Sequence, residues 1–387
     1  MFREKNKGIT LVALVITIFI LLILAGISIS ALSNTGIFQK AKDAKKASEN
    51  AEKEQRETLG EYEKELNKYT AQELTENKIN TVLSKTENTV LKDKNGNVFT
   101  LPAGFKVVVN DDTGNAKTVD KGIVIEDATV DSNGNATPTN GSQFVWVPVG
   151  DIIKEDGNIV EIGLNRYTFE EDGTPTAKNN EVINLYYSET ASKGNTVAKN
   201  ITNFTNSVNA NGGYYIGRYE ARTTTARNDK GNALTQITEK GTDQVYNYVK
   251  QQQAAQLAQE MYTSNNFTSD LMNSYAWDTA TLFLQSCGTN KKYSRQCSLN
   301  TSRLQTGTNS LTEINKIDKQ CNVYDIASNV WEWTTETSSD SDYPCVGRGG
   351  FCDDCLNYFT SIRLSCNTSF GDYGIGFRPL LYVNVWK

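Results

Sequence analysis

Apolar and polar positions divide this chain into four stretches of different texture. The first is an uncharged apolar run over residues 9–33, which follows Arg3, Lys5 and Lys7. Its length matches a hydrocarbon core of roughly 30 Å crossed at about 1.5 Å per residue. The preceding basic residues predict a transmembrane helix with its N-terminus in the cytoplasm and the rest of the chain outside. A cleaved signal peptide is the alternative, although its apolar region is usually shorter.

Helix-forming residues dominate the second stretch, residues 34–80, which is rich in Ala, Glu, Lys and Gln and contains no Pro. Oppositely charged residues four positions apart, with a narrow apolar stripe of Leu59, Tyr62 and Leu66, predict a helical stalk. The alternative is a solvated charged helix without partners.

Short β-rich runs alternate with Asn-Gly turns in the third stretch, residues 81–140, and predict a small β-rich segment. Its Asn- and Thr-rich end, residues 128–142, is typical of an exposed loop or linker.

The fourth stretch, residues 141–387, contains both strand-like and helix-like patterns of apolar residues. Apolar runs at 144–148 and 214–220 predict buried strands, whereas the patterns at 244–261 and 274–286 predict helices. Only short strands and loops are expected after these helices. The fold class is therefore α+β: an N-terminal transmembrane and stalk helix, a small β-rich segment and a larger globular domain.

Composition excludes several functions. The net charge of −6 leaves no broad basic face, so nucleic-acid binding is disfavoured. The chain contains no His, which excludes Ser-His-Asp and Cys-His catalysis and His-ligated metal sites. Seven cysteines leave at least one thiol unpaired if the others form disulfides.

Residues 337–378 use a restricted set of amino acids. They include no Lys, Glu, Gln, Met, Trp or His, although all of these except His occur elsewhere in the chain. A solvated loop would normally carry some Lys, Glu or Gln. The segment therefore suggests a surface whose residues were drawn from a limited set, which favours binding over catalysis. The alternative is an ordinary loop-rich tail of accidental composition.

The residues around this segment are those of a packed scaffold. Trp331 and Trp333 lie two apart, on one face of a strand, and can bury a large apolar area. Glu332 would face the other way and needs a partner, either Arg348 or Arg378. Glycines suit the tight backbone conformations expected nearby. The predicted scaffold residues are Trp331, Glu332, Trp333, Arg348, Gly349, Gly350, Gly376, Phe377 and Arg378.

A set of short sequence motifs in the fourth stretch resembles those of the formylglycine-generating (sulfatase-modifying) family. The motifs, in chain order, are FVWVP (144–148), YIGRYE (215–220), a helix with Trp277, NVYD (322–325), NVWEW (329–333), RGG (348–350) and GFR (376–378). The resemblance covers residues 141–387 and implies a C-type-lectin-like fold. A structural calcium ion is a further implication, although Ser328 stands where the family usually has Gly.

The same resemblance supplies an enzymatic alternative. Catalytic members use two copper-binding, redox-active cysteines after Arg-Gly-Gly, and this chain has Cys352 and Cys355 there. The enzymes' pair is more widely spaced and lies further along. Cys352 and Cys355 are equally compatible with free thiols, a disulfide, or a metal or redox site.

The restricted segment resembles another group, the variable proteins of diversity-generating retroelements. These proteins carry a lectin-like domain last, with a diversified segment before a final Gly-Phe-Arg. Adenine-directed mutagenesis of Asn-type codons gives the residue types found over 351–373 and cannot give Lys, Glu, Gln, Met or Trp. We therefore expect residues 337–378 to form a diversified ligand-binding surface that needs no cofactor. The expected ligand contacts are Phe351, Asp353, Asp354, Asn357, Tyr358, Ser365, Asn367, Thr368, Phe370, Asp372 and Tyr373.

Residues 1–8 resemble a type IV prepilin leader, which implies cleavage between Gly8 and Ile9. Filament-forming pilins usually carry Glu at the fifth mature position, where this chain has Ala13, so filament assembly stays open. The sequence as a whole predicts a single-pass membrane protein that displays its C-terminal domain outside the cell, with or without association to a pilus. Expected partners are an extracellular protein or cell-surface ligand, the membrane, and other pilin-like subunits. The two alternatives are an oxidase of the formylglycine-generating type and a minor pilin whose terminal domain is only structural.

Overall fold

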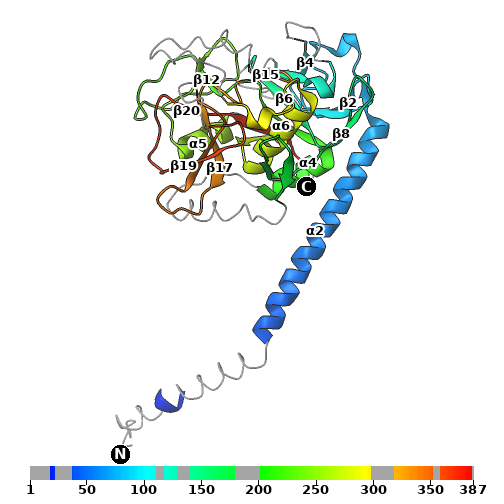
Figure 1. Ribbon diagram of the computed structural model, residues 1–387. Helices are drawn as coiled ribbons and strands as arrows, with labels where there is room; N and C mark the ends of the chain where they lie inside the picture. Colours follow the sequence, from blue (N-terminus) through cyan, green and yellow to red (C-terminus); the bar gives the residue numbers. More distant parts are fainter. Residues whose placement is uncertain are drawn as a thin grey trace, which may run out of the picture. The chain divides into compact units, whose positions relative to one another are not determined.

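The computed structural model describes residues 18–21, 37–109, 117–128, 140–178, 201–297, 318–351 and 358–385. The chain divides into two compact units, residues 1–58 and 59–387. The structure is mixed α+β, as the sequence predicts, with a long helix towards the N-terminus and a second unit rich in strands (Figure 1).

The long helix α2 spans Ile37–Thr70. Up to residue 58 its described side chains are exposed, and ion pairs along the helix join Lys45 to Glu49 (3.6 Å) and Arg56 to Glu52 (2.5 Å). In the second unit Lys64 donates a hydrogen bond to the Val149 carbonyl (2.9 Å). The helix predicted within 34–80 is therefore present, and it ends about ten residues before the predicted boundary.

The predicted membrane localisation is contradicted. No helix in the part of the chain that the structure describes is long and apolar enough to cross a bilayer. The long helix α2 carries charged residues throughout its length, and burying such residues in hydrocarbon is costly. Of the predicted segment 9–33, only residues 18–21 are described, and these are helical. The predicted leader residues Gly8 and Ile9 lie outside the described residues.

An antiparallel six-stranded sheet forms the centre of the second unit, in the order β14-β21-β11-β6-β5-β4. Its strands are β4 (Phe105–Val108), β5 (Val124–Asp127), β6 (Gln143–Pro148), β11 (Gly213–Gly217), β14 (Phe267–Leu271) and β21 (Pro379–Val383). Every residue of β6, β11 and β21 is buried, as expected for strands that are covered on both faces. The strands β4 and β5, from the predicted β-rich segment, belong to this sheet.

Adjacent tyrosines of β11 show what covers each face of the sheet. Tyr214 packs its ring against Phe204 of α4 (Ile201–Asn211) and donates a hydrogen bond to the Ala276 carbonyl of α6 (Ser274–Cys287). Tyr215 points the other way and donates to the Thr100 carbonyl of β3 (Val98–Leu101) at 2.9 Å. The helices α4 and α6 therefore cover one face, while β3 lies against the other. Strand β3 belongs to a three-stranded sheet with β2 (Thr89–Lys92) and β1 (Gln72–Glu73).

A four-stranded sheet in the order β19-β18-β17-β20 carries the restricted segment. Its strands are β17 (Trp331–Thr337), β18 (Cys345–Arg348), β19 (Arg363–Cys366) and β20 (Ile375–Phe377). The pair β17–β20 is parallel and the other two pairs are antiparallel. Smaller ladders are β7 (Gly150–Ile153) with β8 (Ile159–Ile162), β9 (Tyr167–Phe169) with β10 (Pro175–Ala177), β12 (Arg222–Thr223) with β13 (Gln244–Val245), and β15 (Lys319–Gln320) with β16 (Val323–Tyr324).

The helix predicted over residues 244–261 is shorter than expected. The structure has strand β13 at its start and helix α5 only over Gln251–Glu260. The guanidinium of Arg227 donates to the carbonyls of Asn247 and Tyr248, and the Asn247 side chain donates to the Tyr373 carbonyl. These tertiary hydrogen bonds hold residues 246–250 in a non-helical conformation, in which Tyr248 has a φ of +51°, and they override the local helical pattern.

Candidate functional site

The four-stranded sheet presents two chemically different faces. Glu332, Arg348 and Arg363 lie opposite one another on β17, β18 and β19 and therefore share one face. Trp333 and Leu364, with Gly347 between them, share the other face. One face of the sheet is thus ionic and the other apolar, and both anchor the segment between the strands.

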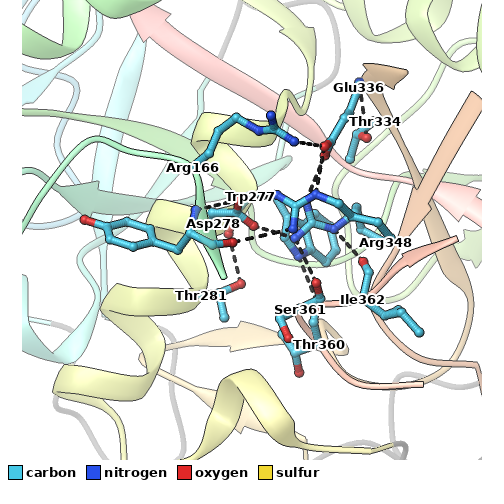
Figure 2. Close-up of polar contacts among 12 residues, drawn as sticks. Arg166, Trp277, Asp278, Thr281, Thr334, Glu336, Arg348, Thr360, Ser361 and Ile362 are labelled. Carbon is cyan, nitrogen blue, oxygen red and sulfur yellow. Dashed lines mark hydrogen bonds and ion pairs between the residues drawn. The ribbon is translucent and has the colours of Figure 1, made fainter. Parts of the chain in front are cut away.

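A buried ion cluster fixes the ionic face (Figure 2). The Arg348 guanidinium lies between the carboxylates of Asp278 (2.5 Å) and Glu336 (3.1 Å). Arg363 contacts the same two carboxylates at 2.5 Å and 2.7 Å, and Arg166 also pairs with Glu336. Charge-assisted pairs of this kind lock side-chain orientation. We call these five residues the Arg348 cluster.

The Arg348 cluster also holds the backbone that re-enters the sheet. Arg348 donates through Nε to the Ile362 carbonyl (2.6 Å), and Trp277 Nε1 donates to the Thr360 carbonyl (2.9 Å). The guanidinium lies over the Trp277 ring, 5.5 Å from its centre (Figure 2). Residues 360–362 are therefore fixed from two sides, immediately before β19.

Opposing effects set the charge states in this cluster. Burial by itself raises the pKa of Glu336, but Arg363, Arg348 and Arg166 together hold it below its ordinary value. Burial by itself lowers the pKa of Arg363, but Asp278 and Glu336 hold it above its ordinary value. The ionised forms of both groups are therefore stabilised.

A second buried ion pair secures the C-terminal end of the segment. The Arg378 guanidinium binds the Glu332 carboxylate through two nitrogens (2.6 and 3.1 Å) and donates to the carbonyls of Gly217 and Tyr324. Of the two partners that the sequence offers for Glu332, the structure selects Arg378. Arg378 thereby links Glu332 of β17 to the backbone of β11 and β16.

An aromatic patch covers part of the segment's surface. The Trp331 ring lies 5.1 Å from Phe351 and 5.3 Å from Tyr358, and Phe351 lies 5.7 Å from Tyr373. The patch is these four residues. Trp331 and Tyr358 are half-buried, whereas Tyr373 is 36% exposed.

The predicted ligand contacts lie in different environments. Ser365, Asn367, Thr368 and Tyr373 are exposed, and Tyr358, Phe370 and Asp372 are half-buried. Asp353, Asp354 and Asn357 lie outside the described residues.

Two of the predicted contacts, Phe351 and Phe370, pack against aromatic residues of the scaffold. Phe351 is buried and packs beneath Trp331 and Tyr373 together with Val245 and Val330. Phe370 packs edge-on against Trp333, with ring centres 6.0 Å apart. Phe351 therefore supports the surface from below, which corrects the expectation that it contacts a ligand, whereas the half-buried Phe370 stays a predicted contact.

The predicted scaffold residues lie in the interior, except for Trp331, which is half-buried. Gly349 has a φ of +82°, and a Cβ there would lie 2.6 Å from the Ile326 carbonyl, so only Gly fits. Phe377 packs against Tyr246 (5.7 Å). Sequence reasoning missed Asp278, Glu336, Arg363 and Arg166. Asp278 offered a signal, because it is a charged residue within an otherwise apolar and neutral helix.

The calcium ion implied by the resemblance stays a prediction. Among the residues that the structure describes, no three His, Cys, Asp or Glu side chains are grouped so that they could hold a metal ion. Ser328, which stands where the resembled family usually has Gly, donates a hydrogen bond to the Asp318 carboxylate (2.7 Å). The next residue, Asn329, has a φ of +67°.

Comparisons with known proteins found similarity only among solved structures. No family model matches this chain, and no curated protein matches it. The Treponema denticola variable protein 1 is 14% identical, with 62% of this chain and 96% of that chain covered and a TM-score of 0.32. PvdO from Pseudomonas aeruginosa is 11% identical, with 62% and 95% covered and a TM-score of 0.36. CarF is 14% identical, with 62% and 98% covered and a TM-score of 0.32. At these values we do not assign the chain to a family.

Proposed function

We propose that the second unit is a ligand-binding domain whose recognition surface is the exposed part of residues 351–373. The surface comprises Tyr358, Ser365, Asn367, Thr368 and Tyr373, with the buried Phe351 beneath it. Within this proposal, residues 141–387 have a C-type-lectin-like fold of the kind found in variable proteins, and residues 337–378 are the diversified segment. The function is recognition of a protein ligand and involves no chemical step.

One observation carries the proposal: exposed and replaceable side chains alternate with anchored ones over a short stretch. Ser365, Asn367 and Thr368 are exposed, while Arg363 is held by two carboxylates and Cys366 is buried. A surface residue that supports no other part of the structure can change at little cost. The restricted composition of the segment fits such replacement.

The exposed residue types suit protein recognition. Tyr supplies rigid amphipathic contact area, and Ser, Thr and Asn supply adaptable hydrogen bonds. The Phe351 ring beneath Tyr373 limits the motion of the Tyr373 side chain, so less side-chain entropy is lost when a ligand binds. Asn367 is also held in place, because it accepts hydrogen bonds from the Ser369 amide and hydroxyl.

A library experiment tests the recognition surface. Ser365, Asn367, Thr368 and Tyr373 are randomised to Tyr, Ser, Asn and Asp, and the displayed library is selected against purified lysozyme. A matched library is built at Glu170, Glu171, Asp172 and Thr174, which are also exposed. We expect binders from the first library alone. Equal recovery from both libraries, or none from the first, contradicts the proposal.

A genomic observation tests diversification separately. The proposal predicts a reverse-transcriptase gene beside a near-copy of the segment that encodes residues 337–378, with differences confined to adenines in the copy. If the surrounding DNA contains no such copy, the composition of the segment has another origin.

A further inference from the structure

Two cysteines face each other across the strands that bracket the candidate recognition segment. Cys345 begins β18 and Cys366 ends β19, and the two residues are directly paired in the antiparallel ladder. Both are buried, with 1% and 7% of their surfaces exposed.

This register brings the two side chains together. Directly opposite residues of an antiparallel pair project from the same face, with Cα atoms about 4.5–5.5 Å apart. Disulfides accept Cα separations of about 4.4–6.8 Å. The thiols also influence each other, since burial and then the neighbouring Cys345 raise the pKa of Cys366 to about 12.

We propose that Cys345 and Cys366 are a disulfide-forming site that clamps β18 to β19, with a small disulfide such as oxidised glutathione as the oxidant. The Cys366 thiolate attacks one sulfur of the oxidant, which gives a mixed disulfide and releases one thiolate. The Cys345 thiolate then attacks the Cys366 sulfur, forms the protein disulfide and releases the second thiolate. Two protons leave the cysteines, and two electrons reduce the oxidant to two thiols.

Accessibility determines when this reaction proceeds. Cys366 is the more exposed thiol, and in the described part of the chain β19 pairs only with β18. A buried thiol of raised pKa is a poor nucleophile, so oxidation of the folded protein is slow. The bond therefore forms readily during folding or when β19 separates from β18.

The disulfide would close the chain around residues 346–365, which include the RGG turn and much of the recognition segment. Such a cross-link removes conformational freedom from the unfolded chain. We expect a rise in Tm of about 5 °C for the oxidised protein over the reduced one. The site does not depend on what the segment binds, so this proposal and the proposed function can fail separately.

Peptide mapping of the full chain tests the site. The protein is refolded from denaturant with reduced and oxidised glutathione, alkylated and digested with trypsin without reduction. Cleavage at lysine and arginine separates a peptide with Cys321 and Cys345, one with Cys352 and Cys355, and one with Cys366. We expect the first and third to be linked, with fragment spectra that place the bond on Cys345. A link from Cys366 to Cys321, Cys352 or Cys355, or no link to Cys366, overturns the proposal.

Matched variants complete the test. Cys366→Ser should remove both the link and the rise in Tm, whereas the double variant Cys352→Ser/Cys355→Ser should keep both. Cys287→Ser is the control for loss of a buried thiol, because Cys287 lies at the end of α6. Mapping of the unmodified protein gives a result even if a variant fails to fold. Retention of the rise in Tm in Cys366→Ser would contradict the clamp.

Discussion

At the scale of single residues, two arginines explain why the segment can be anchored at both ends. Arg348 and Arg378 are both fully buried, and each guanidinium binds at least one buried carboxylate and at least one backbone carbonyl. Guanidinium is suited to this role, because its planar array of donors satisfies several acceptors at once. The chain between these arginines therefore needs few other fixed contacts.

Removal of one charge from the Arg348 cluster should destabilise the fold. Asp278→Asn leaves Arg348 and Arg363 with one carboxylate fewer inside the protein, and breaking such a buried pair costs about 3–5 kcal/mol. Urea unfolding would measure the change, with the exposed Asp172→Asn as control. A loss below about 1 kcal/mol would show that the cluster does not hold the segment.

Exposed positions of the recognition surface should tolerate replacement. Ser365→Tyr and Thr368→Asp change side chains that lie in solvent, so we expect the free energy of unfolding to change by less than about 0.5 kcal/mol. Denaturant titration of each variant beside Asp278→Asn makes the comparison direct. Losses comparable to that of Asp278→Asn would place these residues in the scaffold.

At the scale of elements, a tight turn before β20 determines where the aromatic patch lies. The Asp372 carboxylate accepts a hydrogen bond from the Gly374 amide (2.9 Å), and Gly374 leaves room for the Phe351 ring. Phe351 in turn supports Trp331 and Tyr373. The position of the patch therefore depends on the turn, although the two come from separate parts of the segment.

Gly374→Ala should disturb the aromatic patch. A Cβ at this position would lie 2.8 Å from the Phe351 ring, which must shift, and overpacking of this kind costs about 1–3 kcal/mol. We expect lower stability and altered tryptophan fluorescence, since Trp331 contacts Phe351. Gly347→Ala is the control in the same sheet, because its Cβ would meet Ile375 at an ordinary 3.4 Å. Equal effects of the two variants would contradict this account.

At the scale of the whole molecule, buried acids make stability depend on pH. Burial, followed by the neighbouring Glu332, raises the pKa of Glu220 from 4.5 to about 8, although Arg222 and Arg378 act in the opposite direction. Burial also raises the pKa of Glu239 and of Asp325. These acids lie in the interior of the second unit, so the effect belongs to the domain and not to one strand.

The sign of this dependence follows from proton binding. Between pH 4.5 and 8 the folded state keeps a proton on Glu220 that the unfolded state has lost. The free energy of unfolding should therefore fall as the pH rises through this window. Urea unfolding at pH 5, 6.5 and 8 measures this free energy. Glu220→Gln should weaken its dependence on pH, whereas Glu87→Gln, at an exposed position, should leave that dependence unchanged. A stability that rises from pH 5 to pH 8 would contradict the prediction.

The sequence by itself determined several local elements and the restricted composition of the segment. Periodicity indicated helix α6 and the buried strands β6 and β11, because each pattern is complete within the element. It also limited the partner of Glu332 to two arginines and identified residues 337–378 by composition. Only the tertiary structure decided which arginine binds Glu332, that Phe351 lies inside, and that residues 246–250 are not helical. These outcomes depend on contacts between residues far apart in the chain, such as Arg348 with Asp278, and a local pattern does not encode them.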